Sequence, residues 1–150
     1  LIVINDGSTD ETLAELRRFH DPRIRIYSDG QSKGVAARMN EALLVASGTY
    51  LARMDGDDVS YPHRLEVQLA YLRLHPEVDL VGGGVMVFGS NGLARGKRMT
   101  PETHSDICRS PYGGFPIAQP TFFGKTDWFR RFVYRENIDR CEDQDSDILV

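Results

Sequence analysis

Residues 50–58 read YLARMDGDD, an apolar run that ends in three carboxylates around one glycine. The run before Asp55 predicts a buried strand, and Asp and Gly are typical of the turn that follows a strand. An isolated acidic turn is most often no more than a polar turn. Carboxylates on a tight turn can also bind Mg²⁺ or Mn²⁺ and leave positions open for substrate phosphates. Asp55, Asp57 and Asp58 are therefore candidates for a cation site.

The chain opens with a similar strand and turn. Leu1 to Ile4 is a continuous apolar run that predicts a buried strand, and Asp6 lies in the Asn-Asp-Gly turn directly after it. Ser8 and Glu11 have the spacing of a capping box, which predicts that a helix begins there.

Strands and helices alternate along the first part of the chain. The expected elements after the first strand are a helix to Phe19, a strand over 23–27, a helix from Gly34 to Gly48, the strand over 50–54, a helix after Pro62 and a strand within 78–88. This order predicts an α/β fold, with a Rossmann-like, mostly parallel sheet flanked by helices. Ligands bind beyond the carboxyl ends of such strands. Asp6 and Asp55 both lie at strand ends of this kind, so we expect them to face one cleft.

The alternation of predicted strands and helices is less clear in the later part of the chain. Residues 89–120 are rich in Gly, Pro and Ser, and they predict a long irregular region with one short helix over 102–108. A strand over 118–123 and a short helix over 127–132 are expected after it.

The composition indicates one compact domain. The chain has 150 residues, of which 41% are hydrophobic and 27% charged, with a net charge of -4. This acidic balance argues against non-specific nucleic-acid binding, which depends on a basic face. No run approaches the ~18 apolar residues of a membrane span. Cys108 and Cys141 are too few for a disulfide scaffold, so a reduced cytosolic setting is expected.

The chain begins inside a strand-like run, without an initiator Met, and its last residues (SDILV, 146–150) stop in the middle of another patterned segment. We therefore expect residues 1–150 to form a single domain that is truncated at both ends. A sheet that lacks a strand leaves an exposed edge, which predicts self-association.

Two familiar motifs are incomplete. Residues 124–126 read GKT, but Gln119 stands where a phosphate-binding Walker loop needs its first glycine. His104 and Cys108 could share one helix face, but two ligands do not make a zinc site.

Four segments carry a resemblance to a known family. Residues 2–10 (IVINDGSTD) contain a predicted strand followed by an early aspartate. Residues 34–43 (GVAARMNEAL) contain a glycine, five further residues and then the motif Asn-x-Ala-Leu. Residues 50–58 end a strand in a D-x-D motif, and residues 141–145 (CEDQD) contain a late Glu-Asp pair. In this order the segments resemble the family 2 glycosyltransferases, which have the GT-A fold. The resemblance extends over nearly the whole chain.

The resemblance implies an inverting glycosyltransferase that moves a sugar from a nucleotide-diphospho-sugar, with UDP as the expected nucleotide, to an acceptor hydroxyl. Asp6 would match the acid that hydrogen-bonds the base, Arg38 the basic residue near the nucleotide, and Asp55 the acid near the ribose. Asp57 would match the principal ligand of a divalent Mn or Mg cation. Asp143 would match the catalytic base that removes the proton of the acceptor hydroxyl.

Each assignment has a plainer alternative. Asp6 could cap the following helix, Arg38 could be a solvated helix residue, and Asp58 could only brace its loop. Asp143 lies in an acidic segment that could be a solvated surface, and its neighbour Glu142 is a second candidate for the site.

Two positions depart from the family pattern. Many members have Arg directly before the asparagine, where this chain has Met39, with Arg38 one position earlier. Gln119 stands where the family often has His.

Two other functions stay open: a nucleotidyltransferase of similar fold and a non-catalytic module that binds a nucleotide or glycan. The first usually carries a Gly-rich, basic segment early in the chain, whereas the turn after the first strand is acidic here. The expected partners are a nucleotide-sugar donor and a glycan or lipid-linked acceptor, with no nucleic acid. The resemblance suggests the cytoplasm, at the inner face of the cytoplasmic membrane, and a role in making cell-surface polysaccharide or glycolipid.

Overall fold

The structure is a computed structural model that describes residues 1–109 and 117–136. The chain divides into two compact units. The described residues of unit 1 are 1–47 and 133–136, and those of unit 2 are 48–109 and 117–132.

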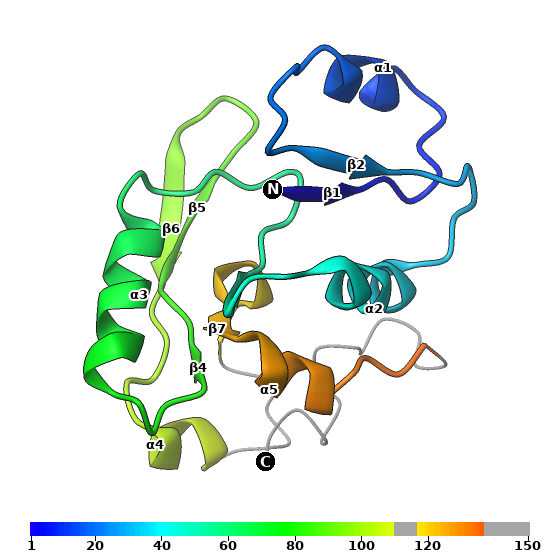
Figure 1. The fold of residues 1–150 in the computed structure, drawn as a ribbon. Coiled ribbons are helices and arrows are strands. Elements are labelled where there is room, and N and C mark those ends of the chain that lie inside the picture. Colours follow the sequence, from blue (N-terminus) through cyan, green and yellow to red (C-terminus); the bar gives the residue numbers. More distant parts are fainter. Residues whose placement is uncertain (110–116, 137–150) are drawn as a thin grey trace. The chain divides into compact units, whose positions relative to one another are not determined.

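Unit 1 contains a β-α-β arrangement followed by a longer helix. Its elements are β1 (Ile2–Ile4), α1 (Thr12–Arg17), β2 (Arg25–Tyr27) and α2 (Val35–Val45). The strands pair in parallel, with Ile2 opposite Arg25 and Ile4 opposite Tyr27, and Figure 1 shows them side by side. Because the strands are parallel, the turn after β1 and the loop after β2 lie at the same end of this small sheet.

The predicted capping box at the start of α1 is wrong. Glu11 is the residue that precedes the helix, and its side chain makes no capping hydrogen bond. The Ser8 hydroxyl donates instead to Asn5 Oδ1 in the turn after β1. The Thr12 amide donates to Asp10 Oδ1 at 3.0 Å. The Ser8 side chain is therefore used within the turn, and Asp10 is the acceptor for the first amide of α1.

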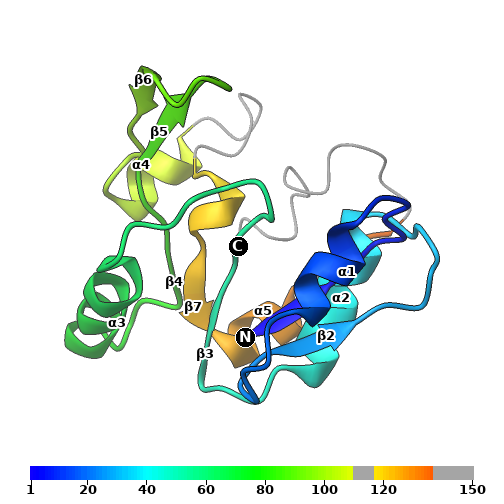
Figure 2. The same cartoon turned by 90° about the horizontal axis from the view of Figure 1, so that it is seen from above.

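Unit 2 is built on a three-stranded sheet. Its elements are β3 (Tyr50–Ala52), α3 (Arg64–Leu74), β4 (Leu80–Val81), β5 (Val85–Phe88), β6 (Ala94–Arg98), α4 (His104–Cys108), the 3-10 helix η2 (Gln119–Thr121), β7 (Phe123–Lys125) and α5 (Thr126–Arg131). The strand order is β3-β7-β4, as Figure 2 shows, and β7 runs antiparallel to both neighbours. The expected mostly parallel sheet therefore needs a correction in unit 2. β3 and β4 run in the same direction, but a later segment lies between them.

Residues 89–120 contain more regular structure than expected. β6 pairs with β5 in an antiparallel hairpin, whose turn is closed by a hydrogen bond of 3.0 Å from the Gly89 amide to the Leu93 carbonyl. The strand expected over 118–123 is wrong. A 3-10 helix with Pro in its first turn occupies 119–121, because proline cannot donate to a strand ladder, and the strand begins only at Phe123.

The core of unit 2 surrounds β7. Phe122, Leu72 and Phe129 are only 1%, 2% and 2% exposed, and α3 and α5 both contact β7. Gly124 permits the close pairing of β7 with β4, because a Cβ there would lie 2.6 Å from the Asp79 carbonyl oxygen. This packing holds β3 in place up to the acidic turn. Among the described residues, no helix is both long and apolar enough to span a membrane.

Candidate functional site

The Asp6 carboxylate joins the turn after β1 to the loop before α2. Its Oδ1 accepts from the Lys33 amide at 2.6 Å and from Arg38 Nε at 2.8 Å. Its Oδ2 accepts from the Gly34 amide at 3.0 Å and from the Ser32 hydroxyl at 3.2 Å. Desolvation raises the pKa of Asp6, but these four hydrogen bonds to the charged form outweigh it, so the pKa is lowered.

Arg38, expected near the nucleotide, is buried in unit 1. Its side chain is 8% exposed, and its guanidinium contacts three carboxylates. Besides Asp6, it donates to Asp29 from both terminal nitrogens, at 2.6 and 3.3 Å, and to Glu41 at 2.6 Å. The Gln31 carbonyl accepts a further hydrogen bond. The alternative of a solvated helix residue does not fit this burial.

The acids around Arg38 were not singled out from the sequence. Glu41 follows Arg38 by three residues in α2, a spacing that predicts an ion pair on a helix. Asp29 lies in the loop after β2, and no local pattern points to it. The hydrogen bonds from Arg38 and Lys33 lower the pKa of Asp29 far below its ordinary range. The bonds from Lys33 and Arg38 also lower the pKa of Glu41.

Asn40, the asparagine of the family-like segment, anchors a distant stretch of chain. Its Nδ2 donates to the Tyr134 carbonyl at 2.8 Å, and its Oδ1 accepts from the Tyr134 amide at 2.9 Å. Tyr134 is 3% exposed. Asn40 thus has a structural role within unit 1, which holds residues 133–136 against α2.

The acidic turn of unit 2 follows β3 as predicted. The Asp58 amide donates to the Asp55 carbonyl at 3.3 Å, which closes the turn. Asp55 is half-buried, while Asp57 and Asp58 are exposed. Burial, followed by the charges of Asp55 and Asp57, raises the pKa of Asp58. The three carboxylates on this short turn therefore repel one another, and a bound cation would reduce that repulsion.

Two arginines stabilise this turn and the end of the strand before it. Arg53 is buried and places Nη2 3.3 Å from Asp55 Oδ1. Arg64, at the start of α3, donates to the Arg53 carbonyl at 2.7 Å and to the Phe122 carbonyl at 3.2 Å. Burial lowers the pKa of Arg64, although the charge of Asp58 acts in the opposite direction. No local sequence pattern points to this role of Arg64.

The donor atoms of the turn fit a divalent cation, although they do not form a complete protein site. Carboxylate oxygens are the ligands that Mg²⁺ prefers, and it is usually held by one or two carboxylates together with substrate phosphates. In the described part of the chain, no three His, Cys, Asp or Glu side chains are grouped so that they could hold a metal ion. Asp57 and Asp55 therefore suit a cation that reaches the protein with a phosphorylated ligand.

The structure brings some predicted site residues together. Asp6 and Arg38 are bonded directly in unit 1, and Asp55, Asp57 and Asp58 share one turn in unit 2. Asp143 and Glu142 lie outside the described residues. Gln119 is buried, and within the part that the structure describes its Nε2 has no hydrogen-bond partner.

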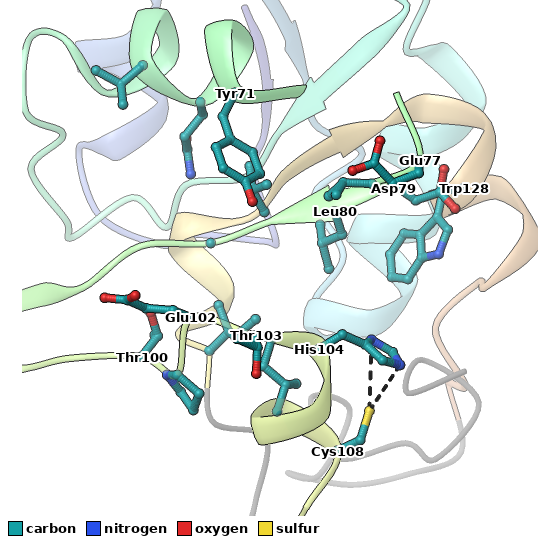
Figure 3. A pocket seen from close by; sticks show the side chains of 18 residues that line it. Tyr71, Glu77, Asp79, Leu80, Thr100, Glu102, Thr103, His104, Cys108 and Trp128 are labelled. Carbon is teal, nitrogen blue, oxygen red and sulfur yellow. Dashed lines mark hydrogen bonds between the residues drawn. The ribbon is translucent and has the colours of Figure 1, made fainter. Parts of the chain in front are cut away.

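A separate cavity of about 990 Å³ lies in unit 2 between α3, β4 and α4. Figure 3 shows His104 and Cys108 at one side of it and Trp128 at the other. The Cys108 sulfur lies 3.5 Å from His104 Nε2. None of the predicted site residues within 1–109 and 117–136 lines this cavity.

The chain has an α/β fold of the GT-A class. TarS of S. aureus, in a structure of residues 1–349, matches with a TM-score of 0.71 and 23% identity, over 95% of this chain and 43% of that chain. The mannosyltransferase PcManGT from Pyrobaculum calidifontis, solved with GDP-Man and Mn²⁺, matches with a TM-score of 0.64 and 16% identity, over 95% and 40% of the two chains.

The sequence model of the family described as Glycosyl transferase family 2 matches residues 1–137, and the chain belongs to this family. EpsE of Bacillus subtilis (strain 168), which is named as a glycosyltransferase, is 41% identical over 104 residues, or 67% of this chain and 37% of EpsE. WfgD of Escherichia coli, named as a UDP-Glc:alpha-D-GlcNAc-diphosphoundecaprenol beta-1,3-glucosyltransferase, is 31% identical over 102 residues, or 68% of this chain and 40% of WfgD. The chain thus spans less than half the length of these relatives.

Proposed function

We propose that the protein is an inverting glycosyltransferase that moves a sugar from a UDP-sugar to an acceptor hydroxyl with the help of a divalent cation. The acidic turn at the end of β3 carries this proposal. It presents carboxylate oxygens on a loop braced by Arg53 and Arg64, in a chain that belongs to glycosyltransferase family 2.

Unit 1 contributes to binding of the nucleoside in this proposal. Asp6 accepts a hydrogen bond from the base, and Arg38 belongs to the same cluster of charges. Asp55 of unit 2 binds the ribose. The resemblance of both segments to family 2 supports these roles.

Asp57 is the proposed principal ligand of Mn²⁺ or Mg²⁺. The cation would neutralise charge on the diphosphate as it leaves. The carboxylate chemistry of the turn supports this role, as does the Mn²⁺ in the structure of PcManGT. Asp58 is a further candidate ligand of lower rank.

Asp143 is the proposed catalytic base, with Glu142 as the second candidate. The base takes the proton of the acceptor hydroxyl while that oxygen attacks the anomeric carbon from the side opposite the diphosphate. The C–O bond to the diphosphate breaks as the new bond forms, which inverts the configuration. A positioned base of this kind contributes roughly 10²–10⁴-fold to the rate.

The proposed acceptor is a glycan or a lipid-linked saccharide. The name of WfgD specifies a diphosphoundecaprenol-linked acceptor, and AmsE of Erwinia amylovora is named for amylovoran biosynthesis. We place the protein accordingly at the cytoplasmic face of the membrane, in polysaccharide or glycolipid synthesis. Self-association of residues 1–150 through an exposed sheet edge is a separate proposal, with sedimentation at several protein concentrations as its test.

The first prediction concerns Asp57→Asn in the full-length protein. UDP with Mn²⁺ is expected to raise the Tm of the wild type, and Asp57→Asn is expected to abolish this rise, because a neutral amide is a much weaker ligand for a hard cation. Differential scanning fluorimetry with UDP, Mn²⁺, and both together provides the measurement.

Asp127→Asn is the matched control, because the Asp127 side chain lies in the same unit and is 92% exposed. This variant should keep the full rise in Tm. A wild type that shows no Mn²⁺-dependent response to UDP, or an Asp57→Asn variant that responds normally, contradicts the proposal. A larger response to GDP than to UDP would correct the nucleotide.

A further inference from the structure

The five N–H groups of Arg38 all have acceptors within unit 1. Nε donates to Asp6, Nη1 donates to Asp29 and Glu41, and Nη2 donates to Asp29 and the Gln31 carbonyl. A guanidinium has no more than five N–H donors. With its side chain only 8% exposed, Arg38 has neither a donor nor a surface left for a nucleotide.

Asp29 and Glu41 determine where the Arg38 guanidinium lies. Asp29 binds both terminal nitrogens in a fork, which fixes the plane of the group as well as its position. Glu41 holds Nη1 from α2 at 2.6 Å. Lys33 contacts the same two acids, at 2.7 and 2.9 Å, so that the two cations and two anions form one network.

The network ends on Asp6. Nε of the fixed guanidinium donates to Asp6 Oδ1, while the backbone amides of Lys33 and Gly34 donate to Oδ1 and Oδ2 respectively. The remaining hydrogen bond, from the exposed Ser32 hydroxyl, is the longest of the four at 3.2 Å. A carboxylate has about four lone-pair sites. A base N–H that binds Asp6 would therefore replace the Ser32 hydroxyl at Oδ2.

We propose that Asp29 and Glu41 are positioning residues for nucleotide binding, which hold Arg38 against Asp6 so that Arg38 acts on the nucleotide through Asp6 and does not touch it. This inference rests on the proposed function, because it needs Asp6 to contact the base. It replaces the expectation that Arg38 itself lies against the nucleotide.

The test uses the full-length enzyme with UDP as the binding probe and compares Asp29→Asn and Glu41→Gln with the wild type. Each change keeps the shape of the side chain and removes its charge. We expect the Kd for UDP, and the KM for a UDP-sugar that the enzyme turns over, to rise roughly tenfold, the size of one lost charged hydrogen bond. The kcat at saturating donor and the KM for the acceptor should stay within about twofold of wild type, because the network touches no reacting atom.

Asp21→Asn is the matched control. Asp21 binds Arg23 through both carboxylate oxygens in the same unit, at distances from 2.6 to 3.1 Å, but the Arg23 side chain is 86% exposed. This variant should bind UDP as the wild type does. Asp29→Glu keeps the negative charge and should therefore lose less UDP affinity than Asp29→Asn.

Several outcomes would overturn the inference. One is normal UDP binding by folded Asp29→Asn and Glu41→Gln variants, and another is a fall in kcat with unchanged donor KM. An equal loss of UDP affinity in Asp21→Asn would show that removing a charge anywhere in unit 1 has this effect. A structure of the UDP complex in which Arg38 contacts the nucleotide would refute the inference directly. A wild type that does not bind UDP would instead overturn the proposed function.

Discussion

Asp6 accepts hydrogen bonds from a loop that lies 26 to 28 residues further along the chain. The loop can reach the carboxylate because β1 and β2 are parallel, which brings the two segments to the same end of the strands. The alternative that Asp6 caps α1 does not match these partners, since none of the four lies in that helix. The position of the Asp6 carboxylate is thus determined by hydrogen bonds from a segment that is distant in the sequence.

Gly7 next to Asp6 is a position where the backbone requires glycine, which gives a prediction at the scale of one residue. Its φ is +70°, and a Cβ there would lie 2.8 Å from the carbonyl carbon of Gln31. Gly7→Ala should therefore lower the free energy of unfolding through both the left-handed backbone and the collision. The denaturant midpoint of the full-length protein provides the measurement.

Gly30→Ala separates these two causes. Gly30 has a similar φ of +75°, but nothing lies within 4 Å of an added Cβ. The left-handed conformation alone costs roughly 1–2 kcal/mol, and we expect about 1–3 kcal/mol more for Gly7→Ala from overpacking. Equal losses in the two variants would show that Gln31 does not approach Gly7 closely.

At the scale of elements, helix α2 shows which features a local pattern can predict. The apolar spacing after Gly34 predicted the helix, and α2 (Val35–Val45) confirms it. The spacing did not show that Asn40 would bind residue 134. That pair is 94 residues apart, so no periodicity within one helix contains it.

Asn40→Ala is a prediction about this connection between elements. The change removes both hydrogen bonds to the backbone of Tyr134 and leaves buried polar groups unsatisfied, which costs about 1–3 kcal/mol. Amide hydrogen exchange at Tyr134 in the full-length protein should become faster than in the wild type.

Asn91→Ala in the exposed turn between β5 and β6 is the control, since Asn91 accepts a local hydrogen bond of 3.2 Å from the Leu93 amide. Its effect on the free energy of unfolding should be within about 0.5 kcal/mol, as for most surface substitutions. Unchanged exchange at Tyr134 in Asn40→Ala would contradict the assigned role of Asn40.

Strand β7 was less predictable than the helices. The strand was expected over 118–123, but it lies at Phe123–Lys125, because Pro120 favours the 3-10 helix before it. Its neighbours β3 and β4 precede it in the chain by more than 40 residues. The alternation of strands and helices along the chain predicts that neighbouring strands are parallel. It cannot show that the later strand β7 lies between β3 and β4 and runs in the opposite direction.

For the whole molecule, the charge network in unit 1 predicts how stability depends on pH. Hydrogen bonds lower the pKa of Asp6, Asp29 and Glu41 below the ordinary values of 3.8 and 4.5 for these acids. Groups with lowered pKa stabilise the fold above their ordinary pKa, and this contribution is lost as the pH falls through the folded-state pKa. We therefore expect the free energy of unfolding to decrease steadily below about pH 4.

Asp29→Asn should make this acid limb shallower, because one of the titrating groups is gone. Denaturant unfolding of the full-length protein at a series of pH values gives the slope of the free energy of unfolding against pH for the wild type and for Asp29→Asn. Asp127→Asn is the control, because the Asp127 side chain is 92% exposed. Parallel slopes for wild type and Asp29→Asn would show that the network does not contribute to acid stability.

The amino-acid sequence by itself determined the family, the order of the main helices and strands, and the acidic turn after β3, because each of these is written in short, contiguous patterns. Only the tertiary structure decided that the buried Arg38 binds Asp6, that Asn40 holds Tyr134, and that β7 lies between β3 and β4. The physical reason is that these contacts join segments far apart in the chain. Such contacts form through burial and the pairing of charges, which depend on where the backbone places each group in space and not on its neighbours in sequence.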